Sequence, residues 1–124
     1  MKLELLSQAF TIYNLQELPI EYFNRNFFFF AKTDEEISLL CPSDFVPNGY
    51  IEKNEGWRGM RIQGTLDFSL VGILSPIASL LAEEKISIFA VSTYRTDYIF
   101  VKENQLSNAL SALQKKGYTV ENIS

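Results

Sequence analysis

The chain has 124 residues, of which 47% are hydrophobic, and a formal net charge of −4. This suits one compact domain or two very small ones that share a core. It contains no histidine, so the usual general base and the commonest metal ligand are absent. We therefore expect no catalytic residue, no metal site and no cofactor. The basic residues are dispersed along the chain, which argues against a nucleic-acid partner.

The apolar segments of the chain are short. None approaches the roughly 20 residues needed to cross a bilayer, and residues 1–6 lack the basic and apolar regions of a signal peptide. We therefore expect a cytoplasmic protein with no membrane partner. Cys41 is the only cysteine, so no internal disulfide can form, and its apolar neighbours favour a place in a strand over a role as nucleophile.

The first half of the chain alternates short apolar runs with turns. Between its first two predicted strands, residues 19–24 leave room for one or two helical turns at most. Residues 42–46 occupy the place of a second helix. The branched and aromatic content typical of strands is found in residues 9–13, 27–31 and 37–41.

The second half follows a complete βαββαβ order. Leu106, Ala109, Leu110 and Leu113 recur with the spacing of an amphipathic helix, and Gly117 follows its last turn. This order is typical of a two-layer α+β unit of the ferredoxin-like kind. The sequence predicts helices over 73–84 and 103–116, and strands over 58–66, 86–92, 97–102 and 118–122.

The two halves resemble each other when one is laid over the other. Residues 28–33 then align with 88–93, and residues 39–41 align with 99–101. We interpret this as two degenerate copies of one unit, although chance similarity between two apolar hairpins is the alternative. Consecutive residues in both hairpins are apolar, so both faces of the sheet need cover. We therefore expect the two halves to pack as one body.

A compact polar cluster separates the two apolar runs of the second hairpin, residues 86–91 and 98–101. Its hydroxyl groups and its carboxylate would lie where the two strands meet, so it has the chemistry to hold a small polar ligand. The alternative is an ordinary hairpin whose turn is polar, as most turns are. The cluster runs from Ser92 to Asp97, and the residues that would present these groups are Thr93, Tyr94, Thr96 and Asp97.

These residues resemble the ACT-domain superfamily, and within it the tandem ACT-domain proteins that include the CASTOR arginine sensors. The chain is also similar to the regulatory end of aspartate kinases. The most specific match is the hairpin of residues 86–103, and a second is the run from Gly72 to Ile86, which resembles the family's glycine-led first helix and its return strand. The resemblance implies two ACT units, a degenerate one over residues 1–56 and a more typical one over 57–124.

Proteins of this kind sense small molecules, most often amino acids, so the resemblance implies a regulatory sensor without a reaction of its own. By position, Gly72 matches the family's loop glycine. Ser69 and Val71 replace an aspartate and a proline that are common in other ACT loops, and Lys85 replaces a common glycine. Thr93, Tyr94 and Asp97 match hairpin positions that hold ligand in the arginine sensors.

The chemistry of an amino acid is compatible with these positions. Its carboxylate needs unpaired backbone N–H groups, which the start of the predicted helix after Val71 would offer. Its ammonium needs a carboxylate, and Asp97 is the only acidic side chain in the polar cluster. The expected ligand-binding residues are Ser69, Leu70, Val71, Gly72, Ile73, Thr93, Tyr94, Thr96 and Asp97.

Three other functions compete with this one. An RNA-binding module shares the element order, and Tyr98 and Phe100 alternate as stacking aromatics would, but Asp97 and Glu103 make the strand acidic. An enzyme of the same fold would need groupings of catalytic residues that the sequence lacks. The main alternative is a ligand-free interaction module that pairs subunits. A homodimer or an unidentified protein partner is compatible with either interpretation.

Overall fold

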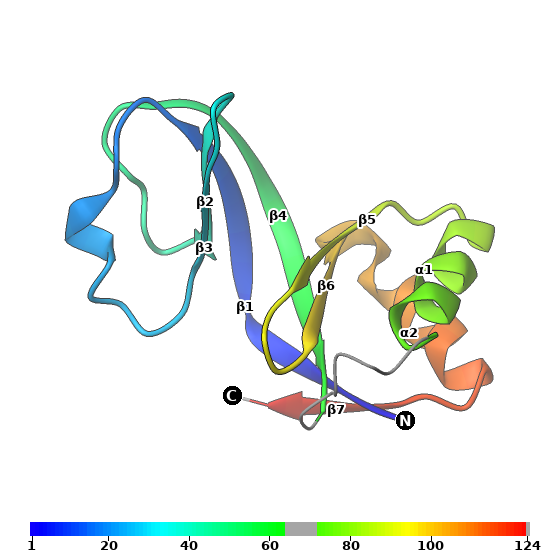
Figure 1. The fold of residues 1–124 in the computed structure, drawn as a ribbon. Coiled ribbons are helices and arrows are strands. Elements are labelled where there is room, and N and C mark those ends of the chain that lie inside the picture. The colour runs from blue at the N-terminus through cyan, green and yellow to red at the C-terminus, as the bar shows by residue number, and fades with distance from the viewer. Residues whose placement is uncertain (64–71, 124) are drawn as a thin grey trace. The chain divides into compact units, whose positions relative to one another are not determined.

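The computed structural model describes residues 1–63 and 72–123. Contacts divide the chain into two compact units, one made of Met1–Ser7 and Trp57–Ser124, the other of Gln8–Gly56. In chain order the elements are β1 (Lys2–Leu15), the 3-10 helix η1 (Ile20–Tyr22), β2 (Phe29–Lys32), β3 (Ile37–Pro42), β4 (Tyr50–Ile62), α1 (Leu74–Glu83), β5 (Ile88–Ser92), β6 (Asp97–Lys102), the 3-10 helix η2 (Glu103–Gln105), α2 (Leu106–Lys115) and β7 (Thr119–Ile123) (Figure 1). None of the described helices is long and apolar enough to cross a membrane.

The unit formed by Met1–Ser7 and Trp57–Ser124 has the predicted βαββαβ order, from β4 to β7. Its strands lie side by side in the order β7, β1, β4, β6, β5. The pairs β4–β6 and β5–β6 are antiparallel, whereas β7 runs parallel to the start of β1, with Lys2 opposite Thr119 and Leu6 opposite Ile123. This confirms the predicted α+β, ferredoxin-like fold class.

The core of this unit lies between the sheet and the two helices. Alternation along the strands sends every second side chain to the helix-covered face. The other face of the same strands presents Arg61 on β4 and Tyr98 on β6, which lie opposite each other. The fully buried core residues include Leu3, Met60, Ile77, Leu81, Ile99, Val101, Ala109 and Leu113.

The unit formed by Gln8–Gly56 contains the first copy of the hairpin. β2 and β3 pair antiparallel with Lys32 opposite Ile37, and β5 and β6 pair in the same way with Ser92 opposite Asp97. The turns also match, because the Thr33 N–H donates to the Glu36 carbonyl at 2.9 Å and the Thr93 N–H donates to the Thr96 carbonyl at 2.9 Å. The predicted repeat of the hairpin is therefore present in the backbone.

Several predicted elements need correction. β1 begins at Lys2, well before residue 9, and β4 begins at Tyr50, well before residue 58. The missed part of β4 contains the charged and exposed run from Glu52 to Glu55, and pairing in a sheet overrides the low β-propensity of such residues. The last part of the predicted strand 58–66 lies outside the described residues.

The two predicted helices that follow the hairpins also differ from expectation. Residues 42–46 form no helix, because Pro42 ends β3 and the segment makes only a turn in which the Phe45 N–H donates to the Pro42 carbonyl at 3.2 Å. The helix predicted over 103–116 begins with the 3-10 turn η2 and becomes an α-helix only at Leu106. Such 3-10 turns are common at helix ends.

Candidate functional site

Two threonines brace the turn between β5 and β6. The Thr93 hydroxyl donates to the Thr96 carbonyl at 2.8 Å and accepts the Thr96 N–H at 3.3 Å. The Thr96 hydroxyl donates to the Ile62 carbonyl at 2.7 Å and the residue is 8% exposed. The predicted ligand residue Thr96 therefore uses its hydroxyl group to hold the hairpin against β4.

Asp97 lies directly after this turn, as the first residue of β6, and is half-buried. Among the described residues, its carboxylate has no hydrogen-bond or ion-pair partner. Its predicted neighbour Tyr94 is 80% exposed at the tip of the turn. The turn is thus internally braced, and the Asp97 carboxylate beside it has the chemistry to bind a cationic group.

The start of α1 contributes two of the predicted residues. Gly72 has a φ of 72°, a conformation that glycine adopts without strain, and no described atom lies within 4 Å of the point where a Cβ would be. Ile73 is the N-cap of α1 and makes no side-chain capping bond, so the first N–H groups of the helix have no cap from this side chain. Ser69, Leu70 and Val71 lie outside the described residues.

A cavity of about 400 Å³ adjoins the hairpin turn. It collects three predicted residues, Thr93, Tyr94 and Thr96, but Gly72 and Asp97 do not line it. The remaining lining residues are Glu4, Arg61, Ile62, Arg95 and Tyr98.

An ion pair that was not expected from the sequence lies in this cavity. The Arg61 Nε donates to the Glu4 Oε1 at 2.6 Å, and hydrogen bonds with Glu4 and then Tyr98 raise the pKa of the Arg61 guanidinium. Alternation along each strand could have placed these side chains on the face opposite the helices. It could not have shown that β1 and β4 bring them together.

The first hairpin has a smaller polar cavity, of about 270 Å³. There the Asn14 Nδ2 donates to the Glu52 Oε1 at 3.2 Å, and the Ser38 hydroxyl donates to the Glu36 Oε1 at 2.9 Å. Glu36 occupies the position in the first hairpin that Thr96 occupies in the second. The two hairpins therefore share their backbone and the threonine that begins each turn, Thr33 and Thr93, but differ where Glu36 replaces Thr96.

The described residues contain no cluster of metal ligands, and Cys41 is poorly suited to act as a nucleophile. Over residues 1–63 and 72–123, no group of three or more Cys, Asp and Glu side chains could hold a metal ion. Cys41 is fully buried, and this burial, with a smaller contribution from Asp44, raises the pKa of the thiol to about 12. A thiol with such a pKa is a poor nucleophile at neutral pH.

Known proteins resemble this chain in both sequence and fold. The family model described as the ACT domain matches residues 52–115. The chain belongs to the ACT domain family. The match begins within β4 and ends at the last residue of α2, so it includes the β5–β6 hairpin and its braced turn.

Among curated proteins, this ACT protein is similar to the "Cytosolic arginine sensor for mTORC1 subunit 1" of Mus musculus. The two are 34% identical over 84 residues, which is 67% of this chain and 25% of the relative. The chain thus spans about a quarter of the length of that relative.

Among solved structures, the ACT protein is similar to protein Atu0741 of Agrobacterium tumefaciens. The TM-score is 0.88 at 28% identity, with 99% of this chain and 93% of the other covered. It also resembles the aspartate kinase of Clostridium acetobutylicum, with a TM-score of 0.63 at 13% identity over 87% of this chain and 32% of the kinase. The second likeness supports the fold alone.

Proposed function

We propose that this ACT protein is a regulatory sensor that binds an amino acid beside the β5–β6 turn and catalyses no reaction of its own. The observation that carries the proposal is the carboxylate of Asp97, which follows a turn braced by Thr93 and Thr96 and has no described partner. A rigid frame with an available charge is what selective binding of a small ammonium ion requires.

The two ends of an amino acid need different groups. Asp97 would bind the ammonium through a charge-assisted hydrogen bond. Backbone N–H groups at Gly72 and Ile73, at the positive end of the α1 dipole, would bind the carboxylate. Tyr94, which is 80% exposed, would close over the ligand, and Ser69, Leu70 and Val71 remain part of the proposed site.

The similar curated proteins are arginine sensors by name and cytosolic by name, which supports an amino-acid ligand and a cytoplasmic location for this chain. A sensor without a catalytic domain must pass its signal to another protein. We propose that ligand binding alters how this chain associates with a second copy or with a regulated partner.

One observation favours the alternative of a ligand-free pairing module. Within the described residues, β5 pairs with β6 alone and lies at the end of the sheet. An end strand presents unpaired backbone groups on which a second copy can add a strand. Such a module would form dimers whether or not an amino acid is present.

A melting-temperature screen against the standard amino acids separates these two functions. A ligand at 100 times its dissociation constant adds about 2.7 kcal/mol to stability. If one amino acid raises the melting temperature, calorimetry should show that Asp97→Asn weakens its binding by about tenfold to a hundredfold. Asp34→Asn, in the exposed turn of the first hairpin, is the matched control and should bind normally.

Two results would count against the sensor. If no amino acid changes the melting temperature while the protein elutes as a dimer, the pairing module is the better account. If Asp97→Asn binds as tightly as the parent, Asp97 does not hold the ammonium.

A further inference from the structure

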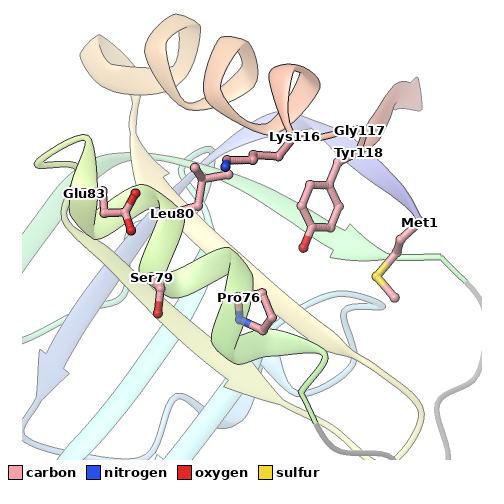
Figure 2. Close-up of a pocket in the computed structure, with 8 residues that line it drawn as sticks. All are labelled: Met1, Pro76, Ser79, Leu80, Glu83, Lys116, Gly117 and Tyr118. Atoms are coloured by element: carbon pink, nitrogen blue, oxygen red, sulfur yellow. The ribbon is translucent and has the colours of Figure 1, made fainter.

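A second cavity, larger than the one beside the hairpin, lies between α1 and the segment that joins α2 to β7. Its volume is about 510 Å³, within the range of pockets that hold small molecules. Figure 2 shows Pro76, Leu80 and Glu83 on α1 facing Lys116 and Tyr118. It shares no lining residue with the hairpin cavity.

Opposite charges lie on its two walls. Glu83 belongs to the last turn of α1, and Lys116 is the C-cap of α2. No ion pair joins them, and neither side chain has another hydrogen-bond or ion-pair partner among the described residues. A molecule with one positive and one negative group can therefore meet both charges at once.

Glu83 lies at a helix end where a negative charge is unfavourable. A carboxylate in the last turn of a helix meets the negative end of the helix dipole, which is unfavourable. The last turn of α1 contains no basic residue, whereas that of α2 contains Lys115. Departures of this kind are expected at functional sites, and an ammonium group bound at Glu83 would offset the repulsion.

The surfaces between the two charges are largely apolar, and Tyr118 adds a hydroxyl group to them. In Figure 2 the Tyr118 ring projects from the residue before β7 toward Pro76, with its hydroxyl group at the inner end, whereas the Ser79 hydroxyl on α1 points away from Tyr118. Leu80 and Tyr118 are half-buried. This combination suits a short carbon chain that carries charged ends.

The backbone on the Lys116 side is held in place. The Gly117 N–H donates to the Gln114 carbonyl and the Tyr118 N–H donates to the Leu113 carbonyl, each at 3.1 Å. Gly117 has a φ of 92° and no described atom within 4 Å of a Cβ position, so it leaves the rim open. The wall is preorganised, which lowers the entropy cost of binding.

We propose that this groove is a second small-molecule site, separate from the hairpin, which binds a zwitterionic amino acid. Glu83 binds its ammonium group and Lys116 binds its carboxylate. Pro76, Leu80 and Tyr118 contact the carbon chain, and the hydroxyl group of Tyr118 is in reach of its polar ends. The site lies wholly in the unit that contains α1, α2 and β7.

The test uses the full chain carrying Asp97→Asn, so that the hairpin site does not contribute. The probes are the standard amino acids and γ-aminobutyrate, with butylamine and butyrate as analogues that retain only one charge each. Calorimetry should show that at least one zwitterion binds and that both single-charge analogues bind at least tenfold more weakly.

Neighbouring residues supply matched controls for the charge variants. Glu83→Gln and Lys116→Gln should each weaken binding of that zwitterion by at least tenfold. Glu84→Gln and Lys115→Gln remove the same charges next to the groove, at residues that do not line it, and should leave binding unchanged. All four side chains are exposed, so we expect each variant to fold.

The proposal is wrong if no zwitterion binds the Asp97→Asn chain, or if the control variants lose binding as much as the groove variants. An amino acid that binds the parent but not Asp97→Asn would overturn the groove site and support the hairpin site. Binding that requires Glu83 and Lys116 but survives Asp97→Asn would support the groove site and count against the hairpin site.

Discussion

Lys85 adopts at the end of α1 the left-handed backbone that Gly117 adopts at the end of α2. Their φ angles are 60° and 92°. After α1, the Lys85 N–H donates to the Ala82 carbonyl and the Ile86 N–H donates to the Leu81 carbonyl, each at 2.9 Å. These two bonds form a Schellman motif, which usually ends on glycine because other residues are strained there.

The same motif ends α2, with bonds from Gly117 to Gln114 and from Tyr118 to Leu113. The position at which Lys85 replaces a glycine common in the family is therefore one where the backbone favours glycine. Ile86 and Leu81 are both buried in the same core cluster, and this burial accompanies the motif and holds Lys85 in this conformation.

We predict that Lys85→Gly stabilises the protein by about 0.5–1 kcal/mol. Relief of the left-handed strain is worth about 1–2 kcal/mol, and the greater freedom of glycine in the unfolded chain offsets part of it. Urea unfolding with an unchanged slope is the measurement. Gly117→Ala should destabilise by a similar amount, and an unchanged midpoint for both variants would contradict the shared motif.

Gly59 is a site where any side chain should be costly. A Cβ added there would lie 2.7 Å from Cε2 of Phe100 and 3.3 Å from Cδ1 of Leu6. The Phe100 ring is fully buried and stacks on Phe89 with a centroid separation of 4.8 Å, so it has little freedom to move. We predict that Gly59→Ala destabilises the protein by about 1–3 kcal/mol in urea unfolding.

Phe100→Leu tests this explanation. If the clash with the ring causes the loss, the double variant Gly59→Ala with Phe100→Leu should lose less stability than the two single variants added together. If the double variant loses as much stability as the two single variants added together, the clash with the Phe100 ring is not the cause of the loss.

The Thr96 hydroxyl should contribute to stability and not to ligand binding. Thr96→Val keeps the shape of the side chain but removes the donor to the Ile62 carbonyl, whose residue is 1% exposed. We predict a loss of about 1–3 kcal/mol in urea unfolding, because a buried acceptor is left without a partner. Thr119→Val, at an exposed position of β7, should change stability by less than about 0.5 kcal/mol. Equal effects of the two variants would contradict the assigned role.

The raised pKa of Cys41 predicts how the stability of the protein depends on alkaline pH. Its pKa of about 12 in the folded state lies above the ordinary value of 9.0, so the folded protein keeps the thiol protonated after the unfolded chain has lost that proton. The contribution is fully present below about pH 9 and is lost as pH rises toward 12. We predict that stability falls in this window by up to about 1.4 kcal/mol per pH unit from this group.

Cys41→Ala provides the comparison for this pH dependence. The variant starts from lower stability because it leaves a small cavity, but its stability should fall less steeply above pH 9. Burial also raises the pKa values of Tyr13 and Tyr22, so both proteins should lose stability above about pH 10. Identical slopes from pH 9 to 10 would show that the thiol does not cause the effect.

Much of this fold could be predicted because the sequence patterns that indicate its helices, strands and turns are local. The β5–β6 hairpin and α1 lie within two residues of their predicted bounds, since strand alternation, helical spacing and turn residues act over a few neighbouring positions. The repeat of the hairpin has the same basis. Thr33 and Thr93 make the same turn because each turn is built from its own four residues.

Pairing between distant strands was decided only by the tertiary structure. Residues 2–6 of β1 pair with residues 119–123 of β7, and the exposed, charged start of β4 is extended although its sequence is typical of a loop. The stability of such pairs depends on partners and burial that no local pattern specifies.

The candidate site also combines a feature that the sequence predicted with features that only the fold decided. The sequence alone indicated a polar cluster from Thr93 to Asp97, because its residue types stand out between two apolar runs. Only the fold decided that Thr96 bonds to Ile62, 34 residues away, while Asp97 keeps its carboxylate without a described partner. A hydrogen bond requires its two groups within about 3 Å of each other, and chain folding alone sets that distance.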